Sequence, residues 1–379
     1  MQVSSSLNPP APASPGLAER LAQRGISRRQ FLKFCGAMAG ALALPPRFAP
    51  RIAAALAAAP RVAVVWMEFQ DCAGNTESFL RAGDPTVAEI VLELLSVNYH
   101  ETIMAPAGRM AEKSLLDTIE QMPGQYIAVV EGAIPLKDGG VYCTVAGQTA
   151  MHTVREVCGK ALATIAVGAC AWDGGWPGAA PNPTGAVGVK EAAPGVKNLI
   201  NLPGCPMNVA NLTAVIVHFL TFNELPLTDN MGRPYFAYGE LIHNNCERRG
   251  HFDSGRFTEE WGDEGHRKGW CLYKMGCKGP ETYSNCPAVG WNSGVSWPIG
   301  AGHGCVGCMS PYFWDKMSPF YERLPDVTGF GIEATADKVG LGVVAGVTGV
   351  FAAHGVLSAV RGRRQPIASH EEAAPTESA

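Results

Sequence analysis

The sequence predicts an α/β protein that combines an open parallel sheet, an irregular cysteine-rich domain and one transmembrane helix near the C-terminus. Three observations support this prediction. Short apolar runs alternate with a helical pattern across residues 56–225, as expected for a flavodoxin-like sheet. Six of the twelve cysteines lie within residues 243–308, in a domain that we place at residues 226–325. Residues 339–360 contain no Asp, Glu, Lys or Arg.

The composition limits the number of domains and the kind of partner. The chain has 379 residues, of which 47% are hydrophobic and 17% are charged, and its formal net charge is -4 at pH 7. This length suits about two domains. Because the charge density is low and slightly negative, we expect no nucleic-acid partner.

The N-terminal residues resemble an export signal. Residues 1–24 are rich in Ser, Pro and Ala, and they precede the paired arginines Arg28 and Arg29. A modest apolar run and then small residues follow. This order is typical of a twin-arginine export signal. We therefore predict a signal peptide over residues 1–55, with cleavage near Ala55.

The sheet is predicted from uninterrupted apolar runs. Residues 62–66, 126–130 and 163–167 read as buried parallel strands, and residues 87–95 carry apolar side chains at helical spacing. Ligands of open α/β sheets bind in loops at the carboxyl ends of the strands. Three candidate loops contain a cysteine, and we expect these cysteines to converge: Cys72, Cys170 and Cys205.

Residues 243–308 are too rich in Gly, Pro and Trp to fold on hydrophobic burial alone. Disulfides, zinc and iron-sulfur clusters are the alternatives for stabilising them. Disulfides alone would leave His243 without a role, whereas three cysteines with one histidine, or four cysteines, form normal zinc sites. The seven candidate ligands divide most simply into two sets, His243, Cys246, Cys271 and Cys277 in one, and Cys286, Cys305 and Cys308 in the other.

Spacing favours iron-sulfur clusters. His243 and Cys246 are three residues apart, which places them on one face of a helical turn. Glycines flank Cys305 and Cys308, so that backbone amides can approach the sulfur atoms closely. Cys286 precedes a proline, as does a cysteine in bacterial ferredoxin runs.

Three long motifs then indicate a family. HFDSGRF (residues 251–257), HRKGWCLYKMGCKGP (266–280) and SWPIGAGHGCVGC (296–308) resemble the small, electron-transferring subunit of membrane-bound uptake nickel-iron hydrogenases. The similarity extends from the export signal to the C-terminal helix. The resemblance implies a distal 4Fe-4S cluster at the set containing His243, a medial 3Fe-4S cluster at the three-cysteine set, and a proximal 4Fe-4S cluster at Cys72, Cys170 and Cys205.

The proximal loop departs from the family pattern of two cysteines separated by two residues. Asn75 stands at the second position. A cluster that lacks one thiolate keeps an open iron, so we favour an oxygen ligand from Asp71, Asn75 or Glu77. Cys143 or Cys158 could instead provide the fourth ligand, or the cluster could hold three iron atoms.

Oxygen-tolerant members of the family gain cysteines at this site. Gly74 and Gly175 occupy those positions here, so oxygen tolerance by that route is not expected.

The resemblance also implies the partners. Once the clusters have their ligands, no cysteine set remains for a nickel-iron centre. We therefore expect hydrogen cleavage on a large subunit docked near Cys72, Cys170 and Cys205, with electrons passing to a membrane cytochrome b and quinone. Two alternatives stay open: an iron-sulfur subunit of another membrane-bound oxidoreductase, and a zinc-stapled, membrane-anchored binding protein.

The uncharged run at residues 339–360 is long enough to span a bilayer as a helix. Three arginines follow it between residues 361 and 364. Positive charge after the helix predicts a cytoplasmic tail over residues 361–379 and places the cluster domain on the periplasmic face. His354, within the span, is a candidate functional residue.

Overall fold

The computed structural model describes residues 27–58, 61–83, 86–324 and 336–364. They belong to two compact units, which divide between Arg323 and Leu324. The predicted leader before residue 27 and the predicted tail after residue 364 lie outside the described residues.

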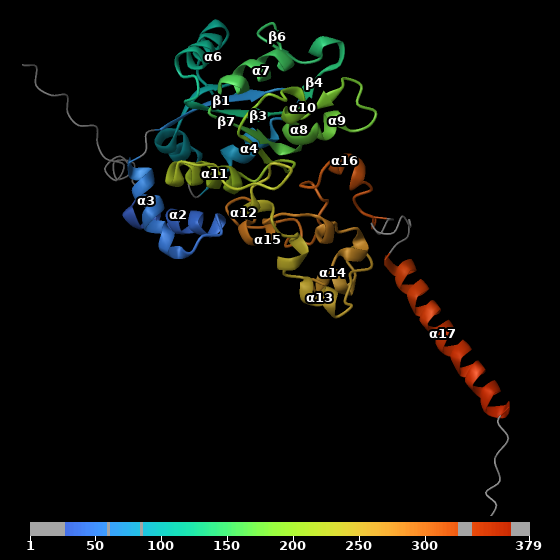
Figure 1. The fold of residues 1–379 in the computed structure, drawn as a ribbon. Helices are drawn as coiled ribbons and strands as arrows, with labels where there is room; N and C mark the ends of the chain where they lie inside the picture. The colour runs from blue at the N-terminus through green and yellow to red at the C-terminus, as the bar shows by residue number, and fades with distance from the viewer. Residues whose placement is uncertain (1–26, 59–60, 84–85, 325–335, 365–379) are drawn as a thin grey trace, which may run out of the picture. The chain divides into compact units, whose positions relative to one another are not determined.

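A five-stranded parallel sheet forms the centre of the first unit (Figure 1). Its order is β2-β1-β3-β7-β9. Counted along the chain, these strands follow the order 2-1-3-4-5 of flavodoxin-like sheets. The predicted open parallel sheet and its three predicted strands are therefore confirmed. The strands are β1 (Val62–Glu68), β2 (Leu95–His100), β3 (Tyr126–Glu131), β7 (Ala163–Val167) and β9 (Leu199–Leu202).

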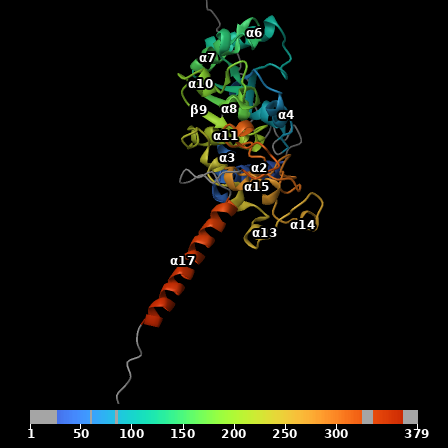
Figure 2. The same ribbon diagram turned by 90° about the vertical axis from the view of Figure 1, so that its right-hand side faces the viewer.

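Apolar side chains cover both faces of this sheet. Every residue of β3 and β7 is buried, as expected for parallel strands between two helical layers. Helices α6 (Arg109–Gln121) and α7 (Ala150–Lys160) pack in the core on one face, and α11 (Val209–Phe222) packs in the core on the other. Figure 2 shows α6 and α7 separated from α11 by the sheet.

The predicted helix over residues 87–95 is shorter than expected. The chain forms α5 (Val87–Glu89) and one π-helical turn, η2 (Ile90–Leu94), and Leu95 then begins β2. Leu95 and Tyr99 are buried and the residues between them are half-buried, as in an edge strand with one covered face. The prediction was wrong for Leu95 because the alternation of β2 begins where the helical spacing ends.

Short elements complete the first unit. No strand of the sheet lies among the described residues after Leu202, where only isolated bridges occur. The remaining elements up to residue 202 are α4 (Gly74–Leu80), β4 (Ile134–Pro135), η3 (Lys137–Gly140), β5 (Thr144–Val145), β6 (Gln148–Thr149), α8 (Gly168–Asp173), α9 (Gly175–Gly178), β8 (Ala186–Val187) and α10 (Val189–Ala192). Those after α11 are α12 (Tyr235–Tyr238), η4 (Ile242–Asn245), α13 (Arg249–Asp253), α14 (Glu264–Arg267), η5 (Tyr273–Met275), η6 (Gly279–Glu281), α15 (Cys286–Val289) and α16 (Phe313–Lys316).

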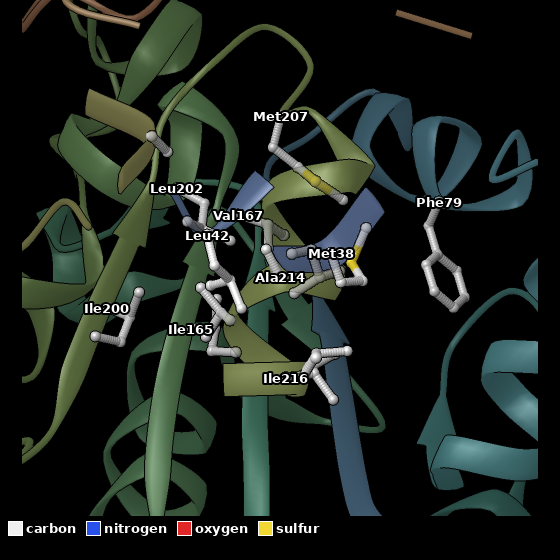
Figure 3. Packing of buried hydrophobic residues seen from close by; sticks show 14 of the residues in the cluster. Met38, Leu42, Phe79, Ile165, Val167, Ile200, Leu202, Met207, Ala214 and Ile216 are labelled. Carbon is white, nitrogen blue, oxygen red and sulfur yellow. The ribbon is translucent and has the colours of Figure 1, made fainter. Parts of the chain in front are cut away.

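The region predicted as an export signal forms a helical hairpin that packs on α11. It consists of α2 (Arg28–Ala41), η1 (Pro46–Phe48) and α3 (Ala49–Ala58), and both longer helices contact α11. Figure 3 shows Met38 from α2, and Leu42 directly after it, among the side chains of α11 and the sheet. Helix α11 is therefore covered by the sheet on one side and by this hairpin on the other.

The second unit contains α17 (Ala336–Arg364). Its apolar stretch, Gly340–Arg361, has a mean hydropathy of 1.8 and is long enough to cross a membrane. No part of that stretch is buried within the described residues, which distinguishes it from the core helix of a soluble protein.

We expect Ile52→Ala to destabilise the chain by about 2–4 kcal/mol, because the change leaves a cavity between α3 and α11. Ile52 is 0% exposed, whereas Leu32 on the same hairpin is 42% exposed. Leu32→Ala is therefore the matched control, with an expected loss below about 0.5 kcal/mol. Urea unfolding of the two variants measures the difference, and equal losses would mean that the hairpin does not pack on the domain.

Candidate metal centres

The first cysteine group lies at the carboxyl edge of the sheet, as predicted. Cys72 follows β1, Cys170 lies in the first turn of α8 directly after β7, and Cys205 follows β9. Burial raises the pKa of Cys170 to about 12, and the charges of Cys205 and Cys72 add to the shift. The three thiols therefore lie near one another. Cys72 and Cys205 are exposed on this edge.

Asn75 stands where the family pattern has a cysteine. Both the nitrogen and the oxygen of its side-chain amide form hydrogen bonds within the protein. Its Nδ2 donates to Glu131 Oε1 at 3.2 Å, and its Oδ1 accepts from the Met207 backbone N at 2.8 Å. Gly168 lies against the same side chain, since a Cβ there would come within 2.5 Å of Oδ1. Asn75 thus links the loop of Cys72 to the loops of Cys170 and Cys205.

A buried carboxylate network supports this edge, and sequence reasoning missed it. Glu131 accepts hydrogen bonds from Trp66 Nε1 and from the backbone N atoms of Asn75 and Thr76. The Thr76 hydroxyl lies 2.7 Å from both Glu68 Oε1 and Glu131 Oε2. Burial raises the pKa of Glu68, and the charge of Glu131 adds to the shift. An acidic residue at the end of each of two apolar strands, Glu68 in β1 and Glu131 in β3, was the sequence signal that could have predicted this network.

Asp71 lies beside this network. Its pKa is raised to about 7, first by burial and then by the charges of Glu131 and Glu68. Within the described part of the chain, its Oδ2 atom is buried and has no hydrogen-bond partner. Glu77, by contrast, is exposed and forms an ion pair with Arg81 at 2.7 Å.

The remaining two cysteines of the first domain do not join the first group. Burial raises the pKa of Cys158 to about 12, and its side chain packs in the core beneath α7. Cys143 is half-buried, and the charges of Glu101 and Asp71 contribute to its raised pKa after burial. Cys143 is therefore a neighbour of Asp71.

The second group surrounds a cavity. All four members of the predicted set, His243, Cys246, Cys271 and Cys277, line one small cavity of about 10 Å³ together with apolar side chains such as Ile299. The backbone N of Arg248 donates to Cys246 Sγ at 3.4 Å. Burial lowers the pKa of His243, which keeps the imidazole neutral and available as a ligand.

The third group, Cys286, Cys305 and Cys308, is more deeply buried. Burial raises the pKa of Cys308 to about 12, and the charge of Cys286 adds to it. The backbone N of Gly307 donates to Cys305 Sγ at 3.4 Å, and Ser284 Oγ lies 3.1 Å from Cys286 Sγ. Donors directed at sulfur are the contacts that tune a bound cluster.

Backbone hydrogen bonds join the three groups in sequence. Cys205 of the first group donates a backbone hydrogen bond that lowers the pKa of Cys308 in the third. The backbone N of Cys305 in the third group donates to Cys277 Sγ of the second at 3.3 Å. The three-cysteine group therefore lies between the other two.

A buried lysine, which sequence reasoning also missed, lies where the second and third groups meet. Lys278 is 2% exposed, and its Nζ donates to the carbonyl oxygens of Gly276 and Pro319 at 3.0 and 3.1 Å and also to that of Glu322. Burial lowers its pKa, and the charges of Cys277 and Cys305 act in the opposite direction. Its position directly after Cys277 was the only signal in the sequence.

These observations test the three kinds of cross-link. All twelve cysteines lie among the described residues, and none forms a disulfide. Among the same residues, no group of three or more His, Cys, Asp or Glu side chains is arranged to hold a metal ion. Several of the thiols accept backbone hydrogen bonds, which are the contacts that tune an iron-sulfur cluster.

Two family descriptions match the chain. The C-terminal family of the NiFe/NiFeSe hydrogenase small subunits matches residues 238–321, which contain the second and third groups. The family described as "NADH ubiquinone oxidoreductase, 20 Kd subunit" matches residues 72–219, which contain the first group.

Whole-chain comparisons agree with these matches. The uptake hydrogenase small subunit of Azotobacter vinelandii is 47% identical over 89% of this chain and 94% of its own length. The quinone-reactive Ni/Fe-hydrogenase small chain of Wolinella succinogenes is 43% identical over 89% of this chain and 97% of its own. A solved NiFeSe hydrogenase chain from Desulfomicrobium baculatum aligns with a TM-score of 0.66 at 35% identity, covering 70% of this chain and 100% of its own. The chain therefore belongs to the small subunits of the membrane-bound uptake nickel-iron hydrogenases.

Proposed function

We propose that this protein holds three iron-sulfur clusters in a row and links the large subunit to a quinone-reducing cytochrome b in the membrane. Its membership of the hydrogenase small subunits makes it the electron-transferring partner of a large subunit, on which hydrogen is cleaved. When bound, the clusters supply one-electron carriers between those two partners.

Each group of ligands receives one cluster in this proposal. A proximal 4Fe-4S cluster binds at Cys72, Cys170 and Cys205, a medial 3Fe-4S cluster at Cys286, Cys305 and Cys308, and a distal 4Fe-4S cluster at His243, Cys246, Cys271 and Cys277. The nickel-iron centre belongs to the large subunit alone.

The observation that carries the proposal is the pair of backbone links, from Cys205 to Cys308 and from Cys305 to Cys277. Cysteines of neighbouring groups therefore lie close together, which supports short separations between the proposed clusters. Electron transfer through protein needs such short separations. The exposed thiols of Cys72 and Cys205 suit a face that is buried against the large subunit.

The membrane side of the proposal rests on other observations. Helix α17 has the length and composition of a membrane span, and three arginines close it. The Wolinella relative is named as quinone-reactive. Together with the twin arginines Arg28 and Arg29, these features support export of the cluster domain to the periplasmic face, with α17 as its anchor beside a cytochrome b.

Breaking the distal site should separate electron relay from hydrogen chemistry. In the purified heterodimer, we expect Cys271→Ala to lower hydrogen oxidation with a quinone analogue by more than about tenfold. Hydrogen–deuterium exchange takes place on the large subunit and should keep its wild-type rate. Cys158→Ala, which alters a buried thiol outside the groups, is the control and should change neither rate.

If Cys271→Ala lost both hydrogen–deuterium exchange and quinone reduction in an intact heterodimer, the proposed separation of electron transfer from hydrogen cleavage would be contradicted. So would a Cys271→Ala enzyme that reduces the quinone analogue at the wild-type rate.

Lys278→Met should lower the reduction potentials of the medial and distal clusters, because a buried positive charge favours the reduced, more negative state. Lys274→Met is the matched control: it removes the same charge from a partly exposed side chain that pairs with Glu259. Redox titration followed by electron paramagnetic resonance measures both shifts. Equal shifts in the two variants, or an upward shift for Lys278→Met, would show that the buried charge does not act on the clusters.

A further inference from the structure

We propose that Asp71 supplies the fourth ligand of the proximal cluster through its Oδ2 atom. The inference rests on the proposed function, since it assumes a proximal cluster at Cys72, Cys170 and Cys205. The proximal loop offers three oxygen donors, and their surroundings in the structure differ sharply.

Asn75 occupies the position of the missing thiolate, but its amide is already committed. Nδ2 donates to Glu131 and Oδ1 accepts from Met207, at 3.2 and 2.8 Å. The residue is 6% exposed, and Gly168 closes the space beside Oδ1. Moving the amide onto iron would leave the buried Met207 N–H and Glu131 with fewer partners, which is destabilising. Asn75 therefore holds the loops together and does not bind iron.

Glu77 has the right charge but the wrong surroundings. Its side chain is 57% exposed on α4 and pairs with Arg81 one helical turn away. Reaching a buried cluster corner would require the carboxylate to leave both water and the guanidinium.

Asp71, unlike Glu77, has a buried carboxylate oxygen and lies next to a cysteine of the first group. It directly precedes Cys72, and its charge contributes to the raised pKa of Cys170, so it lies near two thiols of the group. Its Oδ2 is buried without a hydrogen-bond partner among the described residues. A buried carboxylate oxygen without a partner is destabilising, and coordination to iron removes that penalty. A carboxylate also keeps the single negative charge of the thiolate that it replaces.

The test uses the intact heterodimer and counts iron as well as activity. We compare wild type with Asp71→Asn, which keeps the size of the side chain and removes its charge. Glu77→Gln and Cys143→Ala are the controls, since they alter the other acid of the loop and the free thiol near Asp71. Iron and sulfide content and electron paramagnetic resonance after mild oxidation are the measurements.

The expected result is a loss of about one iron per heterodimer in Asp71→Asn, with a second three-iron signal, while both controls keep the wild-type content. Adding Asn75→Cys to Asp71→Asn should restore the iron, because a thiolate then occupies the family position. An unchanged iron content and proximal signal in Asp71→Asn would overturn the assignment. Loss of iron in Cys143→Ala, but not in Asp71→Asn, would transfer the role to Cys143 and also overturn it.

Two further outcomes distinguish the absence of a proximal cluster from a proximal cluster that Asp71 does not bind. If wild type carries the medial and distal clusters but no proximal cluster, the proposed function fails at that site, whatever the variants show. If Asp71→Asn does not assemble, Asp71→Cys decides instead. Retained iron with an altered proximal spectrum supports ligation by residue 71, whereas retained iron with a wild-type spectrum overturns it.

Discussion

Two contacts between a backbone amide and a cysteine sulfur connect the three cysteine groups of this protein. One runs from Cys205 to Cys308 and the other from Cys305 to Cys277, at 3.3 Å. The first joins the carboxyl edge of the sheet to the irregular domain, and the second lies within that domain. Because each contact joins cysteines of two different groups, the sheet and the short helices around residues 243–308 come together where the three groups meet.

The charged groups around these sites are distributed unevenly. Two buried acidic residues, Glu68 and Glu131, end β1 and β3 at the edge of the sheet that carries the first group. Buried cations, Arg248 and Lys278, lie beside the second and third. Negative charge lowers a reduction potential and positive charge raises it.

The sequence predicted the parallel sheet and its three apolar strands, because uninterrupted apolar runs are local signals. It did not predict β2, whose polar residues Ser96 and Asn98 belong to an edge strand. The packing of residues 28–58 on α11 and the hydrogen bonds of Asn75 were also missed. These features depend on contacts between segments that are distant in the chain, where no spacing rule applies. The ligand assignments and the membrane anchor remain predictions.

The central claim is that the three-cysteine group lies between the other two. Pulsed electron paramagnetic resonance on the intact heterodimer tests this claim through spin–spin coupling. With the medial cluster paramagnetic, reducing the proximal and distal clusters in turn should broaden or split its signal in both steps. If the medial signal stays unchanged when either neighbour is reduced, the three groups do not form one continuous relay.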